Sequence, residues 1–144
     1  MDSPLPLRFK LSLRAGTVYY FTHRGFMSPA PHFFIVVNRE PQTNKVLLLT
    51  AASSQIENVT KRRKNQPPET LVHVAPEEYA AFSKPTVIDC NAVISYSLQE
   101  LVDKSNRKEV KDHADIPPQI LQKILHGIRQ SPLVDGAIKK LVSP

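Results

Sequence analysis

The sequence has few of the residues that build several common sites. It contains 4 glycines against 13 prolines and no Gly-x-Gly-x-x-Gly or Walker pattern, which excludes a glycine-rich loop that cradles a nucleotide phosphate. Cys90 is the single cysteine, so no internal disulfide can form, and no Cys-x-x-Cys pair is present to hold zinc. This cysteine usage is typical of a reducing compartment. We therefore expect a cytoplasmic protein that uses no metal or other cofactor.

Long hydrophobic runs are also missing. The longest apolar segments, residues 33–37 and 46–49, fall far short of the roughly 20 residues that span a bilayer. Residues 1–14 lack the continuous apolar centre of a signal peptide. These absences predict a protein that does not associate with membranes.

What is present is the size and charge of a small basic domain. A length of 144 residues fits one domain, and 41% hydrophobic with 22% charged residues excludes the disordered and coiled-coil classes. The 19 Lys and Arg residues exceed the 13 Asp and Glu residues, which gives a net charge of +6. This charge favours a polyanionic partner such as nucleic acid, because Lys and Arg release condensed counterions from phosphates. A protein that has a basic surface but no polyanionic partner would have the same composition.

The first two-thirds of the chain predicts an antiparallel sheet. Short runs of Val, Ile, Phe and Tyr are separated by Pro, Asn and charged residues, a pattern typical of strands. The second and third runs are nearly continuous in apolar residues, as expected of buried strands or of strands curled into a small barrel. Pro41 and Asn44 predict a hairpin turn between them. The expected strands are residues 16–22, 32–38, 45–51, 70–74 and 86–91.

The last third of the chain has helical periodicity. Ser97, followed three residues later by Glu100, is a capping box and predicts a short helix through Val102. Residues 103–115 are polar and predict a loop.

Two apolar stripes near the C-terminus predict two further helices. One begins at residues 117–118, a pair of prolines, and the second begins at residues 131–132. Such stripes more often pack against a core than bind a partner. We expect a single domain over residues 1–144, with a β-barrel core over 15–94 and a helical extension over 97–144.

A basic connection joins the third and fourth expected strands. Residues 52–69 lack apolar periodicity and predict a long loop, which inside a compact domain is usually functional or disordered. The loop contains Lys61, Arg62, Arg63 and Lys64. This run could contact RNA phosphates, or it could simply be a solvated surface.

Several side chains with suitable chemistry lie at one expected edge of the sheet. The first and third strands of an antiparallel meander run in the same direction, so the loop after the first strand meets the end of the third. Hydrolysing RNA without a metal needs a base near the 2′-hydroxyl, an acid near the leaving oxygen and cations on the phosphate. The candidate residues at this edge are Tyr20, His23, Arg24, Phe26, His32, Thr50, Ser53 and Ser54.

Each candidate has a possible role and an ordinary alternative. His23 or His32 could transfer protons, or His32 could be a structural histidine. Arg24 could stabilise the charged phosphorane, and both His23 and Arg24 could instead be ordinary loop residues. Thr50 and Ser53 could hydrogen-bond the phosphate or could cap a turn. The remaining candidates would bind RNA: Ser54 through its hydroxyl, Phe26 and Tyr20 by stacking on bases.

Four segments stand in an order that is familiar from one family. They are residues 16–21, the run Pro31-His-Phe-Phe-Ile-Val-Val37, the run Leu47-Leu-Leu-Thr-Ala-Ala-Ser-Ser54 and the run Lys84-Pro-Thr-Val-Ile-Asp-Cys90. Together they resemble the PemK and MazF family of toxin ribonucleases over residues 15–102.

This resemblance implies a mainly β fold: a small, curved, antiparallel SH3-like barrel of the PemK and CcdB kind, with C-terminal helices added. It also implies a homodimer that cuts single-stranded RNA without a metal and is held inactive by an antitoxin protein. The catalytic hydroxyl of the family falls on Ser53, with Thr50 nearby. The family's catalytic arginine stands before the proline of the second strand, where this chain has Ala30, so Arg24 is the nearest substitute.

Three functions remain open from the sequence. The first is a toxin endoribonuclease. The second is a nucleic-acid-binding module without catalysis, favoured by the missing arginine before Pro31. The third is a protein-interaction module that uses the apolar stripes and strands.

Overall fold

Three consecutive strands form the centre of the sheet. The computed structural model describes residues 6–23 and 30–142, without the side chains of Arg8 and Leu11. Strands β1, β2 and β3 pair as an antiparallel meander, as the sequence predicted. A single turn of helix, α2, closes the β2–β3 hairpin where Pro41 and Asn44 predicted a turn. The bounds are β1 Val18–Phe21, β2 His32–Val36, α2 Pro41–Asn44 and β3 Val46–Ser53.

Strand β3 is long enough to pair with two further strands on its other edge. Its last residues, Ala52 and Ser53, pair with β5, and residues 46–49 pair with β6. Strand β4 pairs with β5, and β7 pairs with β1. The bounds are β4 Leu71–Val74, β5 Thr86–Asp89, β6 Ile94–Ser97 and β7 Lys111–His113.

The sheet is curved by this branching but does not close into a barrel. Its order is β4-β5-β3-β2-β1-β7, with β6 beside β3, and in the described residues the end strands β4 and β7 do not pair with each other. The expected class, a mainly antiparallel β fold with helices added, is confirmed. The edge of β3 is shared between β5 and β6, so the strands of this open sheet branch at β3.

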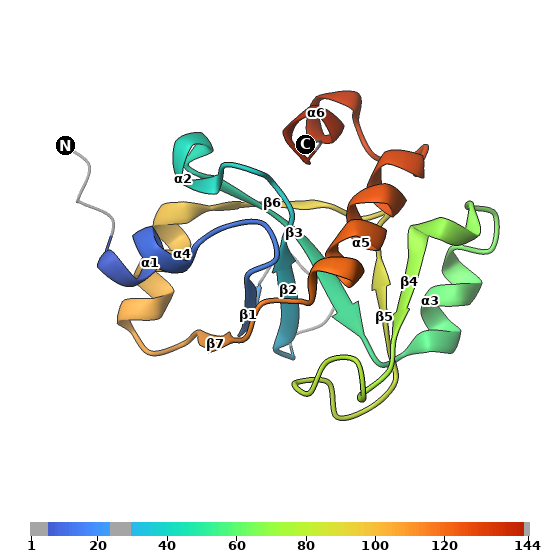
Figure 1. Ribbon diagram of the computed structural model, residues 1–144, viewed down its shortest axis with the longest axis horizontal. Helices are drawn as coiled ribbons and strands as arrows, with labels where there is room; N and C mark the ends of the chain where they lie inside the picture. Colours follow the sequence, from blue (N-terminus) through green and yellow to red (C-terminus); the bar gives the residue numbers. More distant parts are fainter. Residues whose placement is uncertain (1–5, 24–29, 143–144) are drawn as a thin grey trace.

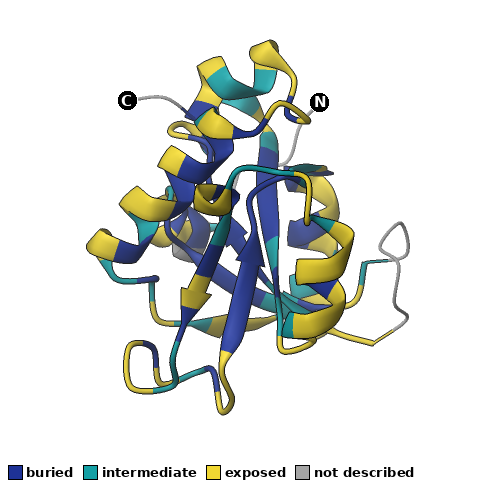
Figure 2. Cartoon of the chain, turned by 90° about the vertical axis from the view of Figure 1, so that its right-hand side faces the viewer, coloured by how far each residue is buried: buried dark blue, intermediate teal, exposed yellow. Residues whose placement is uncertain are grey.

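Helices cover both faces of the sheet. Alternate residues of a strand point to opposite faces, so Val18 packs in one core with α5 and α6, while Tyr19 packs in another with α1 and α4. In Figure 1, α1 and α4 lie on the left and α5 toward the right, with β1, β2 and β3 between them. Figure 2 shows the buried strands inside and the exposed residues on the outer sides of the helices. The helices are α1 Leu7–Ser12, α3 Ile56–Arg62, the 3-10 turn η1 Pro68–Thr70, α4 Leu98–Asn106, α5 Pro118–Gln130 and α6 Gly136–Val142.

The Ser97 N-cap and both C-terminal helices are present, with shifted bounds. The Ser97 hydroxyl accepts a hydrogen bond from the Glu100 amide, and α4 continues to Asn106. Helix α6 begins at Gly136 and not at Ser131. The Ser131 hydroxyl donates to the Asn91 side-chain oxygen and accepts from the Leu133 amide, in the turn that precedes α6. The Asp135 carboxylate then accepts from the Ala137 amide at the start of α6.

Two segments that the sequence predicted as loops contain regular structure. The connection over residues 52–69 contains α3, whose Val59 is buried and whose following residue, Arg63, is tied to Asp89 of β5. Residues 103–115 contain the end of α4 and the short strand β7. Both were missed because they are held by tertiary contacts and carry little apolar periodicity of their own.

Candidate functional site

The strand register places the predicted edge residues in one row. His32 pairs with Phe21, and the pairing of Phe33 with Ala52 puts His32 opposite Ser53. Ser53 in turn pairs with Val87 of β5. The ends of β1 and β3 therefore meet beside the start of β2, as the meander predicted.

A cleft of about 400 Å³ opens at this edge, and we call it the His32 cleft. Its most buried lining side chains are apolar, and they include Phe82 and Ala52. Its exposed lining side chains are mainly polar, and they include Ser54, Gln55 and Lys84. The lining residues are Tyr20, Ala30, Pro31, His32, Phe33, Ala52, Ser53, Ser54, Gln55, Phe82, Ser83, Lys84 and Thr86.

The apolar floor of the cleft is a set of packed aromatic rings. The ring of Phe33 lies 4.7 Å from that of Tyr20 and 5.2 Å from that of Phe82, measured between centroids. The His113 ring, from β7, lies 5.0 Å from Phe33. Rings at these separations stabilise one another by about 0.5–1.5 kcal/mol per pair, so the floor is a firm apolar surface.

The loop that carries Phe82, Ser83 and Lys84 is anchored outside the cleft. The Tyr79 ring lies 4.8 Å from that of Phe82, and its hydroxyl donates a hydrogen bond to the Ala114 carbonyl. Burial, with Asp115 nearby, raises the pKa of Tyr79 to about 12, so this phenol keeps its proton at neutral pH. These contacts fix the wall of the cleft opposite His32.

His32 is the titratable group of the cleft with a displaced pKa. Burial lowers the pKa of its imidazole from the ordinary value of 6.5, because removal from water disfavours the charged form. At neutral pH the ring is therefore uncharged and can accept a proton.

Ser53 and Ser54 both line the cleft, as predicted. The Ser53 hydroxyl also accepts a hydrogen bond from the Gln55 amide at 3.0 Å, so it caps the turn that leads into α3. A serine hydroxyl can accept that bond and still donate its proton to a ligand. The two interpretations of this serine are therefore compatible.

His23 and Thr50 lie elsewhere. The His23 ring lies 5.0 Å from the Tyr96 ring, and both line a separate cavity of about 560 Å³ beside α4. Thr50 has no exposed surface and does not line the His32 cleft. Arg24 and Phe26 lie outside the described residues.

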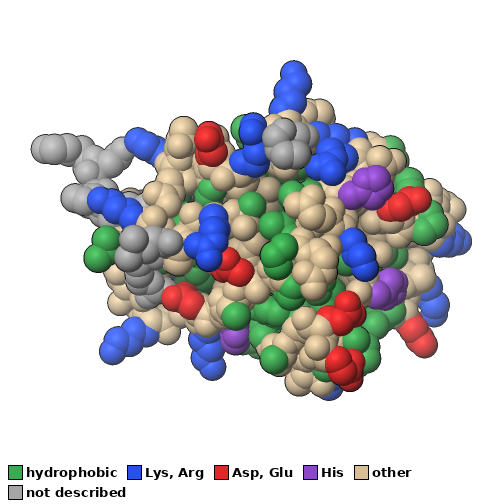
Figure 3. All heavy atoms as spheres, viewed as in Figure 1, with side chains coloured by type: hydrophobic (Ala, Val, Ile, Leu, Met, Phe, Trp, Pro, Cys, Tyr) green, Lys and Arg blue, Asp and Glu red, His purple; other side chains and the backbone are tan. Residues whose placement is uncertain are grey.

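The basic run lies along α3 and beyond it, not in the cleft. Helix α3 follows Gln55, so at 1.5 Å per residue Lys61 is about 9 Å along the helix from the cleft. Arg63 is a structural residue, because its Nε donates to the Asp89 carboxylate at 2.9 Å. Lys61, Arg62 and Lys64 are exposed. In Figure 3, Lys and Arg side chains are spread around the periphery of the face shown instead of forming one patch.

Sequence reasoning missed the wall formed by Phe82, Ser83 and Lys84. These residues come next to Ser53 because β5 pairs with the end of β3, a contact between segments more than 30 residues apart. The available signal was Lys84, which opens the fourth segment of the family resemblance. Cys90, at the other end of that segment, is buried, and burial raises the pKa of its thiol, as fits a small core residue.

Two features are absent from the described residues. Within residues 6–23 and 30–142, no group of three His, Cys, Asp or Glu side chains is arranged to hold a metal ion. In the same described part of the chain, no helix is both long and apolar enough to cross a bilayer.

Comparison with known proteins gives a structural match. No protein-family model matches the sequence, and no curated protein does. The fold is similar to that of a chain in the crystal structure of MazE-MazF (Form-III) from Deinococcus radiodurans, with a TM-score of 0.53 and 11% identity. The match covers 80% of this chain and 91% of that chain. The chain therefore has a MazF-like fold, which is the fold that the resemblance implied.

Proposed function

We propose that this chain is the toxin of a toxin–antitoxin pair and that it cleaves single-stranded RNA, without a metal, in the His32 cleft. The observation that carries the proposal is the composition of that cleft: an imidazole, a serine hydroxyl and an ammonium group stand around an aromatic floor. Aromatic side chains that stack on unpaired bases are typical of single-stranded RNA sites. The MazF-like fold supports the same function.

The chemistry assigns one role to each polar group. The neutral imidazole of His32 takes the proton of a ribose 2′-hydroxyl, and the 2′-oxygen bonds to the adjacent phosphorus. The bond from phosphorus to the 5′-oxygen of the next nucleotide breaks, and that oxygen takes a proton from the Lys84 ammonium group. Ser53 donates a hydrogen bond to a phosphate oxygen as charge develops. The products are a 2′,3′-cyclic phosphate and a 5′-hydroxyl.

Other predicted residues add to this centre and to RNA binding around it. Arg24 supplies a second cation to the phosphate and Phe26 stacks on a base, both from the segment outside the described residues. Lys61, Arg62 and Lys64 attract RNA that extends past Gln55 along α3. The toxin acts as a homodimer, and an antitoxin protein holds it inactive.

Cleavage in EDTA tests the proposal. The purified chain is incubated with a mixed-sequence single-stranded RNA and excess EDTA, and products are resolved on a gel. We expect fragments with cyclic phosphate ends, and we expect His32→Gln and Lys84→Gln each to slow their formation by about 100-fold or more. Intact RNA at micromolar protein, or cleavage unchanged by both substitutions, would remove the catalytic assignment.

A binding module without catalysis is the second candidate. It is favoured because the cleft has few cations. Lys84 is the single Lys or Arg among its described lining residues, and Ala30 stands before Pro31, where the family has its catalytic arginine. In that case the chain binds RNA without forming product, and affinity falls steeply as salt rises. Lys84→Ala would weaken this binding, and the matched surface variant Lys140→Ala would not.

A further inference from the structure

Strand β4 leaves one edge of the sheet open. It pairs with β5 on one side and stands at the end of the strand order. Among the described residues, no backbone group hydrogen-bonds to its outer edge. An open edge presents N–H and C=O groups on which an extended segment can add as a further strand.

The register tells which groups face outward. The Cys90 amide donates to the Thr70 carbonyl at 2.8 Å, which continues the β4–β5 pairing by one residue. Residues of an antiparallel pair alternate between facing the partner strand and facing away. Val72 therefore directs its backbone groups toward β5, and Leu71 and His73 direct theirs to the open edge.

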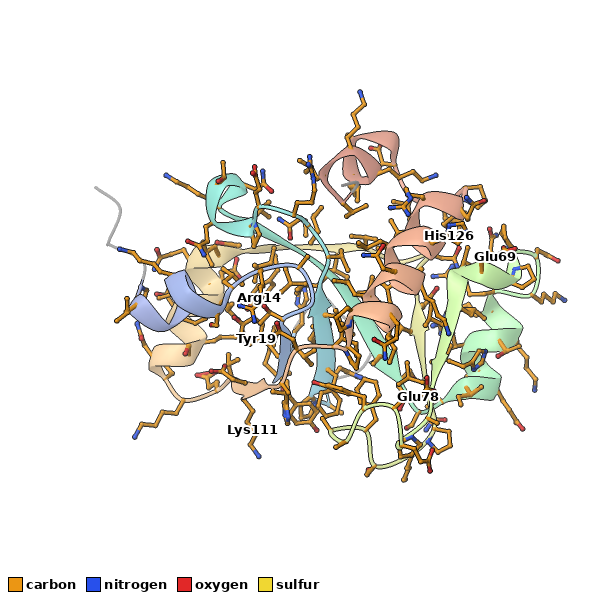
Figure 4. The ribbon with its side chains drawn as sticks, viewed as in Figure 1. Arg14, Tyr19, Glu69, Glu78, Lys111 and His126 are labelled. Carbon is orange, nitrogen blue, oxygen red and sulfur yellow. The ribbon has the colours of Figure 1, made fainter. Side chains whose placement is uncertain are left out.

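A groove of about 380 Å³ runs beside this edge. It is lined by three consecutive strand residues, 71–73, together with Glu69, Lys123 and His126. Because consecutive strand side chains point to opposite faces, a cavity that touches all three lies along the edge of the strand and not over one face. The other wall is α5, and Figure 4 shows His126 of α5 close to Glu69 of η1, the turn that leads into β4. No residue of this groove lines the His32 cleft.

The charged and polar side chains of the groove indicate which kind of segment could bind there. The α5 wall carries Lys123 and His126, both exposed, and Lys123 has no ion-pair partner among the described residues. His73 adds a second imidazole on the strand side, and Glu69 is the one carboxylate among the lining residues. Lys123 is therefore the cation that an incoming carboxylate can pair with, and the imidazole N–H groups can donate to it. We propose that this groove binds an extended acidic segment of a partner protein, which adds as a strand to β4 and places a carboxylate against Lys123.

A proline substitution isolates the backbone contribution. His73→Pro removes the outward N–H of residue 73 while leaving the pairing with β5 intact, as proline is tolerated at sheet edges. His73→Ala removes the same side chain but keeps the N–H, so it is the matched control. The probe is a short synthetic peptide of alternating valine and glutamate, titrated into the isotope-labelled full chain and followed by NMR.

We expect the peptide to shift the amide signals of Leu71 and His73 and to slow their hydrogen exchange. His73→Pro weakens affinity by about three- to tenfold relative to His73→Ala, the range for one net hydrogen bond. Lys123→Glu also weakens it severalfold, and Lys140→Glu, the same charge change on α6, does not. Replacing the glutamates of the peptide by lysine abolishes binding.

Three results would overturn the proposal. The first is no binding of the acidic peptide at millimolar concentration. The second is equal affinity of the proline and alanine variants. The third is binding that shifts residues of the His32 cleft but not Leu71 and His73. Each variant is checked for a wild-type NMR spectrum elsewhere, so that a folding defect is not mistaken for lost binding.

Discussion

At the scale of single residues, the structural environment, and not the residue type, decides which of the two predicted histidines lines the cleft. His32 and His23 are near each other in sequence, but the strand register turns His32 into the cleft and leaves His23 beside Tyr96. Sequence could give both as candidates and could not choose between them. The choice depends on the direction of each side chain at the end of its strand, which is set by pairing with neighbouring strands.

The pH dependence of cleavage tests the role of His32. Burial lowers the pKa of this imidazole below 6.5, and only the neutral ring accepts a proton. The rate of RNA cleavage should therefore rise with pH through that lowered pKa and level off by pH 7. Single-turnover rates measured from pH 4.5 to pH 8 in constant ionic strength give the profile. A rate that falls over this range would mean that the protonated ring is the active form.

Gly127 is a residue whose small size the packing requires. A Cβ at this position would lie 2.6 Å from the Glu69 carbonyl oxygen and 2.9 Å from the Cys90 sulfur. Because a backbone oxygen cannot move aside cheaply, Gly127→Ala should lower the free energy of unfolding by about 1–3 kcal/mol. Gly136→Ala is the matched control, since nothing lies within 4 Å of its Cβ. Equal urea midpoints for the two variants would contradict this account.

At the scale of elements, a buried polar network joins β5 to α5 and η1. The Asn91 side-chain amide donates to the Thr70 hydroxyl at 2.9 Å and to the Asp89 carboxylate at 3.0 Å. Its oxygen accepts from the Ser131 hydroxyl at 2.7 Å. Asp89 also accepts from Arg63, which brings in the end of α3. The network therefore holds together elements that the hydrophobic pattern alone does not position.

Removing the centre of this network should be costly. Asn91→Ala leaves the proton of the buried Ser131 hydroxyl without its acceptor and removes two donors from Thr70 and Asp89, so we expect the free energy of unfolding to fall by about 2–3 kcal/mol. Asn58→Ala removes an exposed amide on α3 and should change stability little. Urea denaturation followed by circular dichroism compares them. A loss below about 0.5 kcal/mol for Asn91→Ala would mean that the network is not a source of stability.

Elements were predictable where local pattern and tertiary structure agree. Strands β1 to β3 and the Ser97 cap follow from short apolar runs, turn residues and capping chemistry. Helix α3 and strand β7 could not be predicted from the local pattern. The burial of Val59 stabilises α3, and backbone pairing with β1 stabilises β7, and both contacts exist only in the folded protein. Sequence-based prediction therefore failed for short polar segments that only tertiary contacts stabilise.

At the scale of the whole molecule, the meander determines which chain segments meet. It brings His32 and Ser53 together, and this much could be predicted from strand direction alone. The wall formed by Phe82, Ser83 and Lys84 could not be predicted in this way, because its position depends on the pairing of β5 with the end of β3. The cleft and the β4 groove share no lining residue, so the proposed RNA site and the proposed protein-binding edge lie on separate surfaces.

The central claim, that the His32 cleft holds single-stranded RNA, is tested most directly by photo-crosslinking. A short oligonucleotide with 4-thiouridine at each position in turn is irradiated with the chain, and the modified residues are identified by mass spectrometry. We predict crosslinks to the cleft, on Phe33, Phe82 or Lys84, that are lost in excess unlabelled RNA. Crosslinks confined to α3 or α6, with none in the cleft, would contradict the account.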